Sequence, residues 1–191
     1  MKGLVKATAV ALMSLVATGV LANNKVGVSA TLADEAARFG IVSESEWMSE
    51  IYRFEAGFMY NTDKDRMIDA SILYTNKGQI DPNLDVGFKA KGALVVVDAV
   101  NKDTYGIMLG VFGRYWLPTP VPSALVAEVI HGPQIITFGE GDSMTELHVR
   151  AQTQLLRNLN GFVGYRSFRI TKDKIDYFVD DAAHLGVELT F

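Results

Sequence analysis

The stretch His184-Leu185-Gly186-Val187-Glu188-Leu189-Thr190-Phe191, at the carboxyl end of the sequence, decides the fold class. Apolar and polar side chains alternate along it, so an extended strand would have one apolar and one polar face. Strands of membrane β-barrels alternate in this way and carry aromatic residues where lipid meets water. We expect an assembly signal for the outer-membrane assembly machinery, formed by His184, Gly186, Leu189 and Phe191. A buried strand of a soluble β-sandwich is the alternative.

The opposite end of the sequence resembles a secretory signal peptide. Lys2 and Lys6 form a positive region, an apolar stretch runs from Ala7 to Val20, and we expect cleavage after Ala22. An uncleaved membrane helix is the alternative, but it needs about 20 apolar residues, more than this stretch provides. We therefore divide the chain into a signal peptide (1–22), an N-terminal segment (23–49) and a β-barrel (50–191).

Composition narrows the function classes. The net charge of −4 becomes −6 if the signal peptide leaves with Lys2 and Lys6, and no basic patch points to nucleic-acid binding. The sequence has no cysteine, which excludes disulfides and thiolate metal sites. We expect no cofactor and no resident metal. Acidic groups such as Asp63, Asp65 and Asp69, or those within residues 173–181, lack the spacing of a calcium loop.

Period-2 alternation recurs along the chain from residue 51 and predicts transmembrane strands rather than helices. Working back from a periplasmic carboxyl end, the segments 132–143 and 171–181 become long extracellular loops, and 118–122 and 158–160 become periplasmic turns. This predicts an all-β, antiparallel up-and-down barrel, most simply of eight strands. A ten-stranded barrel results if residues 25–45 add a hairpin; otherwise the segment 23–49 lies at the periplasmic mouth.

Tyrosines mark the expected rims of the barrel. Tyr105 and Tyr115 lie ten residues apart on one face of a strand. If the strand is tilted by ~40° from the barrel axis, this spacing corresponds to about 25 Å along the axis, which equals the usual height of the apolar band. Tyr52 and Tyr60 repeat the arrangement at a shorter distance. We expect these four tyrosines to form an aromatic girdle, although ordinary strand tyrosines are the alternative.

Several motifs together resemble the YfaZ family of small outer-membrane proteins. They are Gly113-Arg114-Tyr115-Trp116-Leu117-Pro118 before a short turn, Gly161-Phe162-Val163-Gly164-Tyr165-Arg166 on the penultimate strand, and the Gly-x-x-x-x-Phe ending. The resemblance covers most of the chain after the signal peptide. It implies a barrel in the outer membrane and supplies no catalytic residues.

The polar faces of the strands should point into the lumen, and they carry charges of both signs in equal number. The cations are Arg53, Lys89, Lys91, Arg114, Arg150 and Arg166, and the anions are Glu55, Asp69, Asp85, Glu128, Glu146 and Glu188. With His148 these positions predict a network of ion pairs that fills a narrow barrel, because buried charges must pair. We expect Arg150 to meet Glu128 or Glu188.

The sequence therefore favours a structural or surface-interaction role in the outer membrane, in a monomer that contacts outer-membrane lipids and lipopolysaccharide. A small porin is the first alternative. The second is a lipid-modifying enzyme with a rim triad of His131, Glu140 and Ser143. No His-x-Ser or Gly-x-Ser-x-Gly motif is present, so we expect no enzymatic activity.

Overall fold

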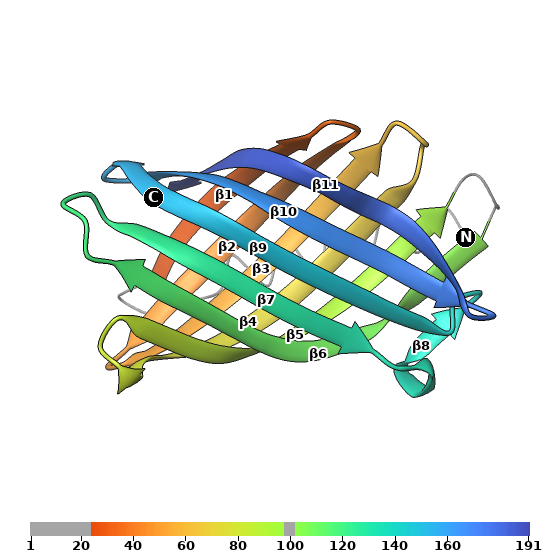
Figure 1. Ribbon diagram of the computed structural model, residues 1–191, viewed down its shortest axis with the longest axis horizontal. Coiled ribbons are helices and arrows are strands. Elements are labelled where there is room, and N and C mark those ends of the chain that lie inside the picture. The colour runs from red at the N-terminus through yellow and green to blue at the C-terminus, as the bar shows by residue number, and fades with distance from the viewer. Residues whose placement is uncertain (1–23, 98–101) are drawn as a thin grey trace.

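The protein, described by a computed structural model for residues 24–97 and 102–191, forms a closed antiparallel β-barrel (Figure 1). Within these residues ten strands make the ring: β1 (Asn24–Ala33), β2 (Ala36–Trp47), β3 (Glu50–Asn61), β4 (Arg66–Asp81), β5 (Leu84–Val97), β6 (Lys102–Leu117), β7 (Ser123–Gly132), β9 (Ser143–Leu156), β10 (Leu159–Lys172) and β11 (Ile175–Thr190). Each strand pairs with its neighbours in chain order, and β11 pairs with β1 to close the ring. The expected all-β barrel is thus confirmed. The signal-peptide prediction lies outside the described residues.

The preferred count of eight strands is wrong, and the ten-stranded alternative is the one observed. Residues 24–47 form the hairpin β1–β2, so the barrel begins well before residue 50. Its alternation was hard to recognise because Ser43 and Ser45 occupy outward positions of β2, whereas Val42 is buried in the lumen. On β1 the inward positions after Lys25 hold only small groups, including Gly27, Ser29 and Thr31.

The expected long loop at residues 171–181 is also wrong. Here β10 and β11 continue to a two-residue turn, Asp173-Lys174, in which both residues have positive φ (51° and 66°). Such a turn matches the twist of a hairpin, so the strands can pair up to it. The segment 133–142 is a true connection, and it contains a 3-10 turn (Gln134–Ile136) and the short strand β8 (Thr137–Gly139), which pairs with β6 outside the ring.

The outer surface of the barrel is apolar. Phe88 is 70% exposed and Leu185 is 63% exposed, and every ring strand carries exposed apolar residues on this side. The described residues contain no helix long and apolar enough to cross a membrane. The polar groups turn inward because side chains alternate along each strand.

One end of the lumen is filled by an apolar core, which we call the methionine-rich cluster. Its members are fully or almost fully buried: Met59, Met67, Ala93, Val95, Met108, Ile130, Met144, Phe168, Ile170 and Val179. The cluster lies toward the end that carries β8 and the β10–β11 turn, opposite the end that carries Phe191 (Figure 1). The expected filling of the lumen by ion pairs and hydrogen bonds alone is therefore wrong for this half of the barrel.

Candidate functional site

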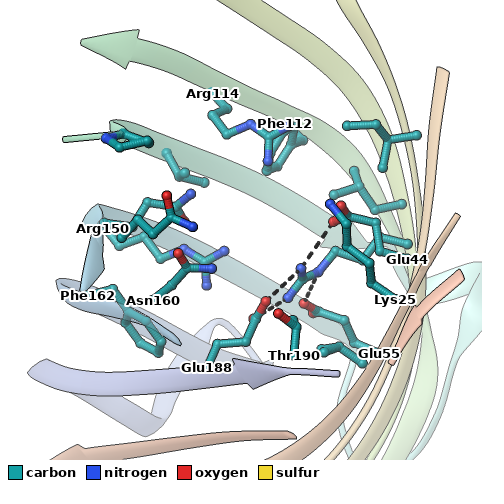
Figure 2. A pocket seen from close by; sticks show the side chains of 18 of the residues that line it. Lys25, Glu44, Glu55, Phe112, Arg114, Arg150, Asn160, Phe162, Glu188 and Thr190 are labelled. Atoms are coloured by element: carbon teal, nitrogen blue, oxygen red, sulfur yellow. Dashed lines mark hydrogen bonds and ion pairs between the residues drawn. The ribbon is translucent and has the colours of Figure 1, made fainter. Parts of the chain in front are cut away.

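A cavity of about 330 Å³, which we call the vestibule, occupies the lumen near the end that carries Phe191. Residues close to that end line its mouth, among them Lys25, Pro122, Arg157 and Thr190. Figure 2 shows Arg150, Asn160 and Phe162 on one side of it, across from Glu44 and Lys25, with Glu188 beside Asn160 on the neighbouring strand. Leu73, Phe112 and Val126 form a small apolar patch on its wall.

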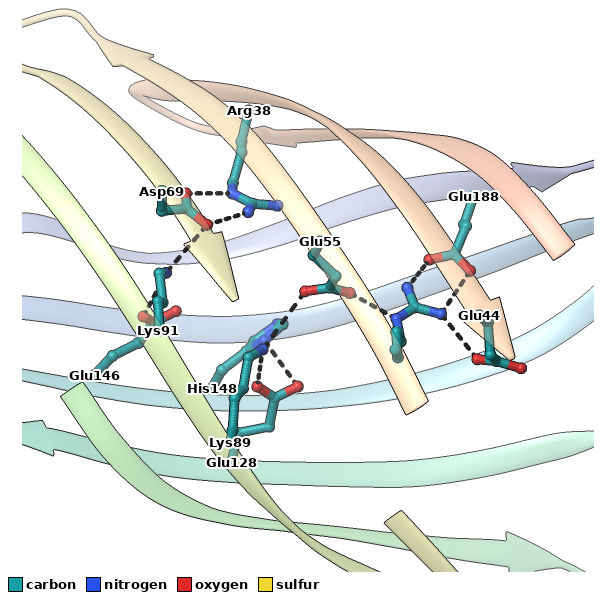
Figure 3. A network of polar contacts seen from close by, with 11 residues as sticks. Arg38, Glu44, Glu55, Asp69, Lys89, Lys91, Glu128, Glu146, His148 and Glu188 are labelled. Carbon is teal, nitrogen blue, oxygen red and sulfur yellow. Dashed lines mark hydrogen bonds and ion pairs between the residues drawn. The ribbon is translucent and has the colours of Figure 1, made fainter. Parts of the chain in front are cut away.

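An ion-pair network crosses the lumen between the vestibule and the methionine-rich cluster (Figure 3). The guanidinium of Arg53 contacts three carboxylates: Glu188 at 2.5 Å, Glu55 at 2.7 Å and Glu44 at 3.3 Å. Glu55 also lies 3.5 Å from Lys89 Nζ, which is 2.6 Å from Glu128. Strands β2, β3, β5, β7 and β11 are thereby linked across the interior.

A second part of the network lies nearer the methionine-rich cluster. Arg38 contacts Asp69 at 2.7 Å, Asp69 lies 3.6 Å from Lys91, and Lys91 contacts Glu146 at 2.7 Å (Figure 3). The remaining cavity at this depth is only about 40 Å³. Replacing one partner of a buried pair would leave an uncompensated charge, so these contacts hold the strands in a fixed arrangement.

The structure places all thirteen residues of the expected lumen network on the inner face of the barrel. Besides the contacts above, Arg114 contacts Asp85 at 2.9 Å, Arg166 contacts Asp180 at 2.5 Å, and His148 Nδ1 lies 4.0 Å from Glu128. The sequence reasoning missed Arg38 and Glu44, because both lie in the segment whose alternation was not recognised.

His184 also belongs to the interior. Its Nε2 atom lies 3.2 Å from His148 Nε2, and its side chain is buried, so the residue assigned to the assembly signal contacts the lumen network. The signal that could have shown this is the alternation itself, because His184 shares its face with Glu188. Leu189 and Phe191 stay on the outside with Leu185 and Val187, and Phe191 donates a backbone hydrogen bond to Val26 at the β1–β11 seam.

The expected partner of Arg150 is wrong. Glu128 binds Lys89 and Glu188 binds Arg53, whereas Arg150 has no ion pair within 4.0 Å among the described residues. Its guanidinium lies 5.2 Å from the centre of the Phe162 ring, and its buried Nε atom has no hydrogen-bond partner. The inward direction of the side chain agrees with the expected strand register.

The four girdle tyrosines lie on the outer surface near the two ends of the barrel. Tyr52 and Tyr115 lie toward the Phe191 end, and Tyr60 and Tyr105 toward the other. Tyr52 packs against Tyr74, with ring centres 5.3 Å apart. Closer to the Phe191 end than Tyr52, at the rim of the barrel, a hydrogen bond from Lys77 lowers the pKa of Glu46.

Two residues of the alternative rim triad, His131 and Glu140, have other partners. His131 points outward from β7, and its Nδ1 atom lies 2.9 Å from Thr145 Oγ1, while Glu140 forms an ion pair with Lys172. Asp180 is buried against Arg166, and Asp176 contacts Arg169. Within residues 24–97 and 102–191, no three His, Asp or Glu side chains gather as ligands for a metal ion.

Comparison with known proteins gives the family. The sequence matches the family described as YfaZ precursor over residues 1–191. The chain belongs to the YfaZ family. The resemblance noted from the barrel motifs is therefore confirmed.

Solved structures with a similar fold include a bacterial polysaccharide outer membrane secretin, at 12% identity and a TM-score of 0.46, and the outer membrane channel DcaP of Acinetobacter baumannii, at 11% and 0.44. The alignments cover 88% and 90% of this YfaZ-family chain, but only 64% and 60% of those structures. The beta domain of the Bordetella autotransporter BrkA is similar at 9% identity with a TM-score of 0.43, with 88% of this chain and 99% of that one covered. A search of curated proteins finds no match.

Proposed function

We propose that this chain is an integral β-barrel of the bacterial outer membrane, with a closed lumen and a structural or surface-interaction role. The outer surface supports the membrane location. Contiguous exposed apolar surface on every ring strand would be unfavourable in water, and tyrosines near both ends suit the two interfaces with lipid headgroups.

The methionine-rich cluster is the observation that carries the closed lumen. A passage for solutes needs a continuous path of water, but Met59, Met67, Met108, Met144 and Phe168 are fully buried inside the barrel. The ion-pair network reduces the space beside it further. A small porin therefore fits the geometry less well, and two residues of the alternative rim triad, His131 and Glu140, have other partners.

The proposal includes an orientation and a biogenesis route. The end with Phe191 faces the periplasm, because the longest described connection, 133–142, lies at the opposite end and long loops of such barrels are extracellular. Residues 1–22 are removed on export. The assembly machinery recognises the last strand, and the mature monomer contacts outer-membrane lipids and lipopolysaccharide.

Cysteine labelling of intact cells tests location and orientation together, because the native sequence has no cysteine. Asp34→Cys lies in the β1–β2 turn and Ser49→Cys in the β2–β3 turn at the other end, and both sites are exposed. We expect a membrane-impermeant maleimide to label Asp34→Cys in intact cells, and Ser49→Cys only after the outer membrane is permeabilised.

Cell fractionation supplies the second measurement. The membrane fraction should contain the protein, and its gel mobility should change on heating, as expected of a folded barrel. Recovery from the soluble periplasm without detergent would overturn the proposal, as would equal labelling of the two cysteine variants in intact cells.

A further inference from the structure

Arg150 differs from its neighbouring cations inside the vestibule. Arg53 and Arg114, which line the same cavity, are paired: Arg53 contacts three carboxylates and Arg114 contacts Asp85. At the depth of Arg150, Glu128 and Glu55 are within 2.6 and 3.5 Å of Lys89. Arg150 has no such contact among the described residues, and its Nε atom is buried without a hydrogen-bond partner. Arg150 is only partly buried and has no carboxylate contact, so its guanidinium can form charge-assisted hydrogen bonds with an anion that enters the cavity.

The surroundings of Arg150 suit an anionic ligand. Asn160 and Gln152, which line the same cavity, can supply amide N–H donors (Figure 2). Arg157 and Lys25 line the mouth, and no carboxylate of the described residues lies within 4.0 Å of either. A negatively charged molecule that enters at this end meets these two cations beside Glu44 and Glu46, and the guanidinium of Arg150 deeper inside.

The shape of the cavity limits the ligand. A volume of about 330 Å³ is at the small end of the range for ligand pockets. Phe162 and Phe112 offer apolar walls beside the polar groups. The vestibule ends at the ion-pair network and the methionine-rich cluster, so a molecule that enters must leave by the same mouth.

We propose that the vestibule is a binding site for a small soluble organic oxyanion, a carboxylate or phosphate ester, whose charged group is bound by Arg150. Arginine forms paired hydrogen bonds with both groups. A closed ring of backbone hydrogen bonds separates the vestibule from the outer surface, so a soluble anion fits better than the headgroup of a surrounding lipid.

Titration calorimetry on the folded barrel in a non-ionic detergent tests this site. The probes are citrate, glucose 6-phosphate and inorganic phosphate at millimolar concentration, with glucose as the uncharged control. We expect at least one oxyanion to bind and glucose not to bind. Short-chain phosphatidylglycerol is the lipid arm, and it should bind more weakly than the soluble probes.

Variants locate the site. Arg150→Gln should weaken binding by about tenfold or more, because charge-assisted hydrogen bonds are lost. Arg169→Gln is the matched control, since Arg169 is an exposed arginine near the opposite end of the barrel. It should leave the affinity unchanged. Heat-modifiable mobility verifies that each variant is folded, and Asn160→Leu gives a second test at the same wall if Arg150→Gln does not fold.

Three results would overturn the proposal. The first is the absence of oxyanion binding to the folded wild-type barrel. The second is unchanged affinity in the folded Arg150→Gln variant, or in Asn160→Leu if Arg150→Gln does not fold. The third is tighter binding of the lipid than of any soluble probe. None of them depends on cellular location, so failure here is distinguishable from failure of the outer-membrane proposal.

Discussion

Val149 and Arg150 are adjacent on β9 and point to opposite sides of the barrel wall. Val149 is 39% exposed on the outside, whereas Arg150 lines the vestibule. Val149→Arg places a charge on the apolar surface, which costs about 2–4 kcal/mol near the middle of a bilayer. Arg150→Gln leaves no paired carboxylate behind, so its effect on stability should be smaller. Denaturant unfolding of both variants in lipid vesicles measures the difference.

The comparison also tests the strand register. Val149→Thr, which adds no charge at the same position, is the control for a general intolerance of β9 to substitution. Greater destabilisation by Arg150→Gln than by Val149→Arg would contradict the assignment of lipid-facing and lumen-facing sides.

Phe191 offers a test of assembly at the residue scale. Its side chain is 75% exposed, and its backbone N–H bonds to Val26 where β11 meets β1. Phe191→Ser should lower the membrane-inserted fraction, because the assembly machinery would lose the terminal aromatic group. Phe191→Tyr keeps an aromatic ring and should insert normally. Equal insertion of Phe191→Ser and the wild type, measured by heat-modifiable mobility, would remove Phe191 from the signal.

At the scale of the strand, two glycines of β6 should respond differently to the same change. A Cβ atom at Gly110 would lie 1.9 Å from the carbonyl oxygen of Val129 on β7, whereas one at Gly113 would meet nothing within 4 Å. Gly110→Ala must therefore shift backbone and should destabilise the barrel by about 1–3 kcal/mol. Gly113→Ala should change the unfolding free energy by less than about 0.5 kcal/mol.

Unfolding of the two alanine variants in the same detergent gives this comparison directly. Equal stability would show that β6 and β7 are less closely packed at Gly110 than the structure indicates.

Element by element, alternation in the sequence predicted most ring strands from β3 onward, because their outward faces are continuously apolar. It predicted β1 and β2 only as an alternative, since small residues on β1 and serines on β2 weaken the contrast between faces. The acidic residues near Asp180 are typical of a solvated loop, which is why the sequence predicts a loop where β10 and β11 form a hairpin. In the fold, Asp180 is buried beside Arg166.

The interior was predictable in its charges and not in its apolar part. Alternation places side chains on a face, and it therefore located the cations and carboxylates of the lumen. Which charges pair depends on register across non-neighbouring strands, so the partner of Arg150 was wrong. Methionines at inward positions, such as Met59 and Met108, are the sequence signal that indicates the apolar core, because a charged lining would not place them there.

At the scale of the whole molecule, the lumen has three layers: the vestibule, the ion-pair network and the methionine-rich cluster. Only the first is open to solvent at the end that carries Phe191. This arrangement supports the proposals of a closed lumen and of a cavity that is reached from one side, and it favours a structural or surface role over transport.

Single-channel recording in planar bilayers tests the closed lumen most directly. Heat-modifiable gel mobility of the same wild-type preparation verifies that the barrel is folded and inserted. The account predicts that inserted wild-type protein shows no stable open conductance. Stable, large conductance steps from inserted wild-type barrels would contradict the closed lumen and make the protein a small porin.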